Sequence, residues 1–166
     1  MSDLSKYRAK VITVSTRSFN GIWEDTSGPA VVEKLKGWGL DCAGPEIVPD
    51  GELVKQKLGE AIADRFHLII TNGGTGLSPT DLTPEMTKQV IEREAPGIAD
   101  AIRGYGLSKG IANSVLSRGI AGIAKESLII NFPGSLPGVN DALMAIENIL
   151  LHALEQMAGD DHQRRG

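Results

Sequence analysis

The sequence predicts an α/β fold of three layers, in which a mostly parallel β-sheet lies between two layers of helices. Short apolar segments alternate with amphipathic helical stripes, and the turns between them are short. Several of these segments are apolar on both faces, which is typical of parallel strands that helices cover on each side. The 166 residues suit a single domain over residues 1–166, with flexible ends at 1–9 and 159–166.

Composition narrows the class of protein. With 41% hydrophobic but only 4% aromatic residues, the core must consist mainly of Ile, Leu, Val and Ala. A net charge of -4 argues against non-specific binding of nucleic acid, which needs a basic face. Cys42 is the single cysteine, so neither an internal disulfide nor a cysteine-based metal site is available. The polar N-terminus and the absence of a long apolar run predict a cytoplasmic protein without membrane contact.

The first predicted strand covers residues 11–14, which are β-branched throughout. A hydroxyl-rich loop over 15–21 follows it. A helix then begins near Thr26 or Ser27, either of which suits an N-cap, with Pro29 in its first turn. Its apolar face comprises Val31, Leu35 and Trp38.

The second strand is predicted over 43–48 and the third over 68–70. Asp50 follows the second strand and suits the cap of an intervening helix, whose apolar stripe comprises Val54, Leu58, Ala61 and Ile62. After the third strand we expect a helix over 84–94, capped by Thr83, and another over 98–107.

The C-terminal third leaves two points open. Residues 108–117 show no clear periodicity. The apolar segments 120–124 and 128–131 form either a hairpin around Lys125 and Glu126 or one strand preceded by an irregular stretch. A final helix over 139–157 carries a continuous apolar stripe, which packs on the sheet, on a neighbouring subunit, or on both.

A glycine-rich loop over 71–81 is the stretch around which the chain is organised. Gly73, Gly74 and Gly76 allow a sharp bend and close approach of the backbone to a ligand, because they lack a Cβ. Successive free N–H groups in such a loop bind phosphate, and Asp81 is placed to hold a divalent cation beside it. The alternative is a tight strand-to-helix turn in which Asp81 is a cap or a surface residue.

Four candidate loops are expected at one edge of the sheet, because ligands bind at the carboxyl ends of parallel strands. They are the loop over 15–21, Asp50, the glycine-rich loop, and the loop that contains Ser135. Asp50 and Asp81 together suit Mg²⁺, which prefers oxygen ligands, although either is also a plausible helix cap. Ser117, Arg118 and Ser135 would contact an anion through hydroxyl and guanidinium groups. No GxxxxGK[ST] sequence is present, so a P-loop is excluded.

Several ordered motifs resemble the molybdopterin adenylyltransferase family, and the resemblance covers about residues 10–155. The motifs are Asp25-Thr26-Ser27-Gly28-Pro29, Val48-Pro49-Asp50, Thr71-Asn72-Gly73-Gly74-Thr75-Gly76, Thr80-Asp81-Leu82-Thr83-Pro84-Glu85, Glu92-Arg93-Glu94-Ala95-Pro96-Gly97, Leu116-Ser117-Arg118 and Asn131-Phe132-Pro133-Gly134-Ser135. This family belongs to the wider molybdopterin-binding group of molybdenum cofactor biosynthesis.

The resemblance implies a molybdopterin-binding fold, a homotrimer, and Mg-ATP-dependent adenylylation of molybdopterin with loss of pyrophosphate. The substrates are then ATP and molybdopterin, the cofactor is Mg²⁺, and a molybdenum-insertion protein is a possible partner. By position, Asp50 and Asp81 correspond to functional carboxylates that also hold the metal. The implied binding residues are Asp25, Ser27, Gly73, Gly74, Thr75, Gly76, Ser117, Arg118, Pro133, Gly134 and Ser135.

Two departures from the family pattern bear on function. The family commonly has Ser-Asp after the first strand, where this chain has Ser15-Thr16, so a hydroxyl replaces a carboxylate. After Ser135 the family commonly continues Pro-Lys, where this chain has Leu136-Pro137 and lacks the positive charge. A non-catalytic molybdopterin-binding or scaffold protein is therefore the alternative, and a phosphate-binding α/β domain with another substrate is a third reading.

Overall fold

The computed structural model describes residues 3–159 and contains one six-stranded sheet in the order β2-β1-β3-β6-β5-β4. The strands are β1 Arg8–Val14, β2 Asp41–Val48, β3 Leu68–Asn72, β4 Arg93–Glu94, β5 Ala121–Ala124 and β6 Ser127–Phe132. The first four strands in the spatial order are parallel, and β5 and β4 are antiparallel to their neighbours. The sheet is therefore mostly parallel, as predicted.

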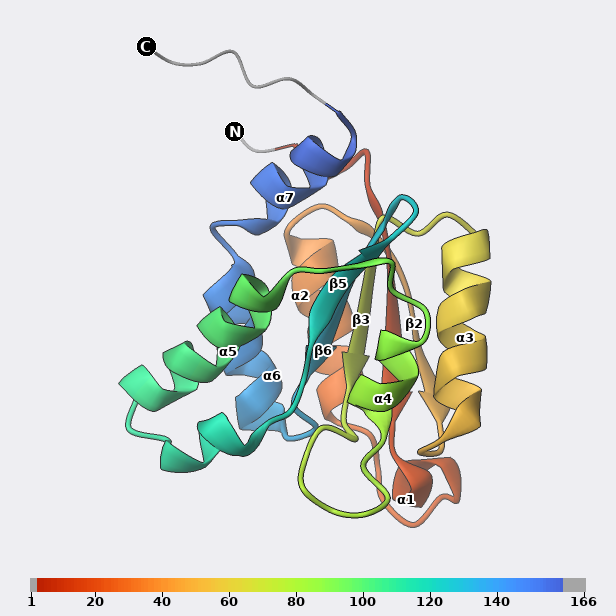
Figure 1. The fold of residues 1–166 in the computed structure, drawn as a ribbon, viewed down its shortest axis with the longest axis vertical. Coiled ribbons are helices and arrows are strands. Elements are labelled where there is room, and N and C mark those ends of the chain that lie inside the picture. The colour runs from red at the N-terminus through yellow and green to blue at the C-terminus, as the bar shows by residue number, and fades with distance from the viewer. Residues whose placement is uncertain (1–2, 160–166) are drawn as a thin grey trace.

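Helices cover both faces of this sheet (Figure 1). They are α1 Thr16–Phe19, α2 Ser27–Gly37, α3 Glu52–Ala63, α4 Thr83–Lys88, α5 Pro96–Ser108, the 3-10 helix η1 Ala112–Leu116, α6 Leu136–Ile146 and α7 Leu150–Met157. Apolar side chains of α2, α5, α6 and α7 pack into the core on one face. Those of α3 and α4 pack into the core on the other, so the predicted three-layer α/β/α fold is confirmed.

Strand β3 shows how helices on both faces of the sheet bury a central strand. All five of its residues are buried. Leu68 and Ile70 belong to the core under α2 and α6, whereas Ile69 between them belongs to the core under α3. Because side chains alternate between the faces of a sheet, a strand covered on both sides is buried at every position. The polar Thr71 is accommodated because its hydroxyl accepts a hydrogen bond from Asn131 Nδ2 at 2.9 Å.

The order of the strands determines at which edge of the sheet a ligand site can form. From β1 the chain passes through α2 to β2 on one side, and through α3 it returns to β3 on the other side of β1. Strands β1 and β3 therefore flank a topological switch point, where the crossing helices leave a crevice at the carboxyl ends of the strands. Loops that follow β1, β2, β3 and β6 all emerge at this edge (Figure 1).

The N-terminal leader expected over 1–9 requires correction. Strand β1 begins at Arg8, and Leu4 and Tyr7 are already buried. The Tyr7 ring packs edge-on against His67, so an aromatic contact holds the segment before the strand. Residues 1–2 and 160–166, the rest of the predicted flexible ends, lie outside the described residues.

The helix predicted over 84–94 is shorter than expected. Helix α4 ends at Lys88, and residues Arg93 and Glu94 form the edge strand β4 against β5. The Glu92 amide also donates to the Ile123 carbonyl at 2.8 Å. Backbone pairing with a strand that is distant in sequence thus replaces the last helical turns. The hairpin β5–β6, one of the two open alternatives, is confirmed.

The final predicted helix is two helices. It breaks between Ile146 and Leu150, where Glu147 accepts a hydrogen bond from Trp38 Nε1 at 3.0 Å and faces Lys34 at 3.9 Å. The apolar stripe is nevertheless continuous, because α6 and α7 contribute to the same core against the sheet. The described part of the chain contains no helix long and apolar enough to cross a membrane.

Candidate functional site

A pocket of about 740 Å³ lies at the carboxyl edge of the sheet. All four predicted loops contribute to its wall, through residues such as Ser15, Asp50, Gly74 and Ser135. Strand ends contribute as well: Thr13 Oγ1 of β1 lies 3.2 Å from Asn72 Oδ1 of β3 across the switch point. The tertiary structure therefore gathers loops that are as much as 120 residues apart into one cavity, from Ser15 to Ser135.

The glycine-rich loop needs glycine for steric reasons. Gly73 has a φ of +103°, and a Cβ at this position would lie 2.2 Å from the Val14 carbonyl oxygen. The Gly73 amide donates to the Phe132 carbonyl at 3.1 Å, which ties the loop to β6. The amides of Gly74, Thr75 and Gly76 donate to no acceptor within residues 3–159. Gly74 lines the pocket whereas Thr75 and Gly76 do not. Successive free donors in such a loop suit a phosphate cradle that begins at Gly74.

Asp50 is held by Thr16 and does not cap a helix. The Thr16 hydroxyl donates to Asp50 Oδ2 at 3.0 Å and accepts from the Asp50 amide at 3.1 Å. Helix α3 instead has Gly51 as its N-cap, without a side-chain bond. The capping interpretation of Asp50 is therefore wrong, and the hydroxyl that replaces the family carboxylate positions a neighbouring carboxylate.

The second oxygen of Asp50 fits a cation. Asp50 Oδ1 is buried and has no hydrogen-bond partner among the described residues, and the same is true of Thr83 Oγ1. Both oxygens flank Gly74, where a Cβ would lie 2.7 Å from Asp50 Oδ1 and 2.2 Å from Thr83 Oγ1. A buried carboxylate oxygen without a partner is costly, so a bound cation that prefers oxygen ligands suits this position. Thr83, expected as a cap, is the first residue of α4 and follows the N-cap Leu82.

Asp81 lies on the far side of the glycine-rich loop. Its Oδ2 accepts a hydrogen bond from the Ser78 amide at 3.1 Å, and the carboxylate lines the pocket. No group of three or more His, Cys, Asp or Glu within residues 3–159 is arranged to hold a metal. A cation here would therefore have one or two protein carboxylates and would take its other ligands from water and substrate phosphate, as Mg²⁺ commonly does.

Asp25 and Ser27 fasten the first loop to its neighbours. Asp25 accepts from Thr13 Oγ1 at 2.7 Å and from the Gly28 amide at 2.9 Å, so it caps α2 although Thr26 is the N-cap residue. The Ser27 hydroxyl donates to the Gly134 carbonyl at 2.8 Å, which links this loop to the one after β6. Both residues line the pocket.

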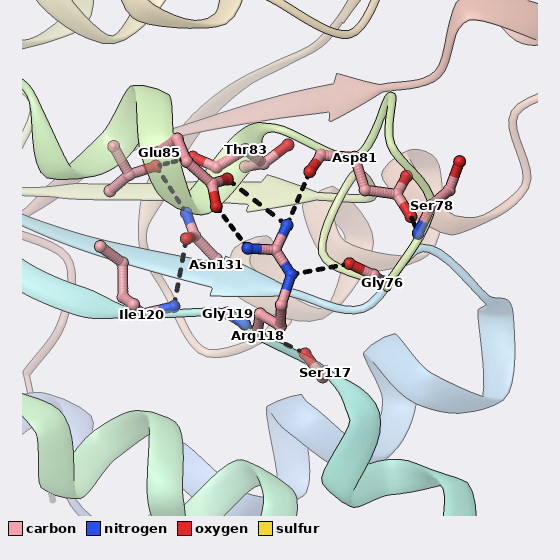
Figure 2. Close-up of polar contacts among 11 residues, drawn as sticks. Gly76, Ser78, Asp81, Thr83, Glu85, Ser117, Arg118, Gly119, Ile120 and Asn131 are labelled. Carbon is pink, nitrogen blue, oxygen red and sulfur yellow. Dashed lines mark hydrogen bonds and ion pairs between the residues drawn. The ribbon is translucent and has the colours of Figure 1, made fainter.

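Arg118 braces the glycine-rich loop (Figure 2). Its guanidinium donates to the Gly76 carbonyl at 2.9 Å and to the Asp81 carbonyl at 2.6 Å, and it forms a short ion pair with Glu85. Arg118 is not among the residues that line the 740 Å³ pocket. Its guanidinium thus holds the backbone on either side of the loop, so a role in direct anion contact remains a prediction.

The other predicted residues differ in their relation to the cavities, and Thr75 and Gly76 line neither the 740 Å³ pocket nor the smaller one beside it. Thr75 is buried, and its hydroxyl lies 3.3 Å from the Ser117 hydroxyl behind the loop. Ser117 and Pro133 line an adjoining cavity of about 210 Å³. Ser135 lines both cavities, and it caps α6 by accepting from the Gly138 amide at 3.1 Å.

The pocket wall is acidic. Its ionisable side chains are Glu24, Asp25, Asp50 and Asp81, together with Arg17, which is the only cationic residue among the described residues of the wall. Phosphorylated ligands would meet net repulsion in such a pocket, so a divalent cation is the natural counter-charge. Leu136 and Pro137 follow Ser135, so that loop adds no positive charge either.

Sequence reasoning missed Arg17, Trp23, Ser78 and Thr80, all of which line the pocket. Arg17 belongs to the segment 15–21 that was predicted as a loop after the first strand, so its position at the functional edge was available from the sequence. Trp23 comes after a turn whose path only the folded chain defines.

The stabilising effect of the ion pair between Arg118 and Glu85 is expected to depend on pH. The hydrogen bond from Arg118 lowers the pKa of the Glu85 carboxyl below its ordinary value, so the stabilisation is present at neutral pH and is lost as pH falls through the lowered pKa. Glu85→Gln is therefore expected to lower the melting temperature at pH 7. The loss in the free energy of unfolding should be about 1 kcal/mol or less, because the pair is partly exposed. The difference should vanish in strong acid.

Thermal unfolding at several pH values checks this expectation. Glu94→Gln is the matched control, because Glu94 and Lys88 are 3.9 Å apart and both are well exposed. Equal shifts for the two variants at neutral pH, or a shift from Glu85→Gln that persists in acid, would contradict the brace.

Comparisons with known proteins identify the family. Residues 10–156 match the family described as a probable molybdopterin binding domain. A molybdopterin adenylyltransferase of Helicobacter pylori is 34% identical over 154 residues, covering 90% of this chain and 87% of the relative. The molybdenum cofactor synthesis protein cinnamon of Drosophila melanogaster is 36% identical over 157 residues, but the match spans 91% of this chain and only 25% of that protein.

Solved structures agree with this assignment. The molybdopterin biosynthesis Mog protein from Mycobacterium ulcerans superposes with a TM-score of 0.87 at 44% identity, covering 91% of this chain and 99% of that one. The chain therefore belongs to the molybdenum cofactor biosynthesis family of probable molybdopterin-binding domains.

Proposed function

We propose that this chain adenylylates molybdopterin: it transfers AMP from Mg-ATP to the terminal phosphate of molybdopterin and releases pyrophosphate. The observation that carries this proposal is the unpartnered Asp50 Oδ1, buried beside a glycine-rich loop with free amides in a pocket of about 740 Å³. Donors for phosphate and an oxygen ligand for a cation meet there. The name of the Helicobacter pylori relative, of which the chain covers 87%, supports the same activity.

The proposed reaction needs no general acid–base catalysis by the protein. A phosphate oxygen of molybdopterin attacks the α-phosphorus of ATP, the bond to the β-phosphate oxygen breaks, and the electron pair leaves with pyrophosphate. Since the nucleophile is already an anion, no general base is needed. The protein must hold two anions in line and offset their repulsion.

The chain's own residues supply the positioning. The free amides of Gly74, Thr75 and Gly76 donate to phosphate oxygens without adding a titrating group. Asp50, oriented by Thr16, and Asp81, fixed by the Ser78 amide, would hold Mg²⁺. When bound, Mg²⁺ neutralises charge on the phosphates. Arg118 keeps the loop in place by bonding to the carbonyls of Gly76 and Asp81.

The direct test incubates the purified protein with molybdopterin, ATP and Mg²⁺ and detects adenylylated molybdopterin and pyrophosphate by chromatography and mass spectrometry. Product that depends on both substrates and on the cation supports the proposal. Folded protein that binds molybdopterin but forms no product would exclude the activity and favour a binding or scaffold role.

Thr16 is the observation that favours the second candidate, a non-catalytic molybdopterin-binding protein. If the family carboxylate at this position is needed for the metal, a hydroxyl cannot replace it. If its task is to position Asp50, the two hydrogen bonds of Thr16 to Asp50 fulfil it. The geometry favours the positioning role, and with it the enzyme, because the Thr16 hydroxyl donates to Asp50 and accepts from it at once.

Substitutions of Thr16 separate the two candidates. For an enzyme, Thr16→Val is expected to reduce turnover about ten-fold or more, since it removes both hydrogen bonds at nearly constant volume. Thr16→Ser, which keeps the hydroxyl, should retain most of the rate. The opposite result would be an inactive wild type together with a Thr16→Asp variant that forms product. That result would establish the binding-only candidate.

We also propose a homotrimer in the cytoplasm that docks a molybdenum-insertion protein. Four exposed apolar side chains near the end of α5 and in η1 support self-association: Leu107, Ile111, Val115 and Leu116. Light scattering of the purified protein measures the molar mass, and a monomer at micromolar concentration would contradict the trimer.

A further inference from the structure

Trp23 and Arg17 form an unusual pair at the wall of the pocket. The Trp23 ring is 59% exposed although it borders the cavity, and the Arg17 guanidinium carbon lies 4.2 Å from the ring centroid. A single exposed aromatic residue is ordinary on a protein surface. Here the ring packs against a cation and the residue borders a cavity, and these two features together indicate a binding role.

The local backbone builds this pair. Arg17 lies in α1, whose N-cap Ser15 accepts from the Ser18 amide at 3.1 Å. The chain then turns at Gly21, with a φ of +73°. The amides of Ile22 and Trp23 both donate to the Arg17 carbonyl, at 2.8 and 3.4 Å. Trp23 is thereby folded back over Arg17 before any ligand binds.

The guanidinium N–H groups of Arg17 are available to a ligand. Its guanidinium stacks on the indole and makes no hydrogen bond or ion pair within residues 3–159. It is also the only cationic residue among the described residues of an otherwise acidic wall. Stacking uses the face of a guanidinium and leaves its edge N–H groups free, and these groups match phosphate geometry well.

We propose that Trp23 and Arg17 form a clamp for a flat nitrogen heterocycle that carries a phosphate. The ring stacks on the exposed indole, and the edge of the Arg17 guanidinium donates to the phosphate. This inference rests on the proposed function and deepens it, because both proposed substrates, the adenine nucleotide and the phosphorylated pterin, have this chemistry. Stacking is tolerant of ring identity, since every such heterocycle has a π-face.

Intrinsic fluorescence tests the clamp directly. Trp23 and Trp38 are the two tryptophans, so Trp38→Phe leaves Trp23 as the single reporter. Trp38 bonds to Glu147 and does not line the pocket. Titration of this variant with Mg-ATP and with molybdopterin is expected to quench Trp23 saturably. Inorganic tripolyphosphate, which carries charge without a ring, should leave the emission almost unchanged.

Affinities from equilibrium dialysis provide the second readout. Trp23→Ala is expected to weaken binding of the stacked ligand about ten-fold, whereas Trp23→Phe restores most of the affinity. Arg17→Gln should weaken tripolyphosphate as well as the ring ligand. Phe19→Ala is the matched control, because Phe19 is 53% exposed in the same segment but does not line the pocket.

The outcomes are distinct. Quenching by Mg-ATP alone assigns the clamp to the nucleotide, and quenching by molybdopterin alone assigns it to the pterin; either supports the proposal. The clamp is overturned if tripolyphosphate quenches as strongly as the ring ligands, if neither ring ligand binds, or if Trp23→Ala and Phe19→Ala bind both ring ligands equally well.

Product formation by the wild type is measured in parallel. Turnover without any effect at Trp23 refutes the clamp alone, whereas ring-specific quenching without turnover refutes adenylyl transfer alone.

Discussion

Asp50→Asn is expected to lower the rate of molybdopterin adenylylation at least about 100-fold while leaving the folded protein at least as stable as the wild type. Asn keeps the shape of Asp and can still accept the hydrogen bond from Thr16. It removes, however, the negative charge from an oxygen that is buried without a partner. Such a charge suits a cation and is unfavourable for the free protein, so its removal costs activity but not stability.

Two measurements separate these effects. Turnover reports the lost cation site, and thermal unfolding with and without Mg-ATP reports binding, because a ligand that binds only the folded state raises its stability. The wild type should gain melting temperature with Mg-ATP, and Asp50→Asn should gain little. Asp81→Ala, which removes the second carboxylate, is expected to lose turnover with the fold intact.

Asp64→Asn is the matched control for the carboxylate variants, because Asp64 ends α3 at its C-cap, away from Gly51 at the start of that helix. A wild-type rate for Asp81→Ala would show that the metal role of Asp81 is wrong. A fall in stability on Asp50→Asn would show that another group partners Asp50 Oδ1 in the free protein.

Gly73→Ala is expected to destabilise the protein by about 3 kcal/mol or more and to abolish nucleotide binding. Its Cβ would lie 2.2 Å from the Val14 carbonyl oxygen, a backbone atom that belongs to β1 and cannot move aside cheaply. The left-handed φ of +103° adds strain that any side chain would feel. Relief requires the loop to leave the sheet edge, which would break the Gly73–Phe132 hydrogen bond.

Gly51→Ala is the control that isolates the clash. Gly51 has a φ of +111°, but a Cβ there would meet no atom within 4 Å, so only backbone strain of about 1–2 kcal/mol applies. Thermal unfolding followed by circular dichroism should show a distinctly larger loss for Gly73→Ala. Equal losses would mean that strain alone, and not close approach to β1, requires glycine at position 73.

The layers and the functional edge could be predicted because they depend on local patterns. Leu68, Ile69 and Ile70 of the buried strand β3 are apolar in succession, and such a run indicates a sheet covered on both faces. Once strands and helices alternate, the rule that ligands bind at the carboxyl ends of parallel strands places Asp50 and the glycine-rich loop together. Both line the same pocket.

Errors arose where distant contacts override local preference. The segment around Arg93 has helical character in the sequence but pairs with β5, and the apolar stripe around Ile146 gave no sign of the break where Glu147 bonds to Trp38. Hydrophobic periodicity reports which face is buried, not whether the backbone remains helical between two buried faces. The assignment of Thr83 as a cap failed for a similar reason, since capping depends on backbone geometry at a single residue.

Residues alone determined the fold class, the presence of a glycine-rich loop after a strand and the acidic character of the chain, because each follows from composition or short-range pattern. Only the tertiary structure decided what the individual side chains do. It made Thr16, which stands in place of a family carboxylate, the partner of Asp50, and it showed that Arg118 braces the loop through the Gly76 carbonyl. It also brought Trp23 to the pocket. These roles depend on distances between residues that are remote in sequence, and only packing sets such distances.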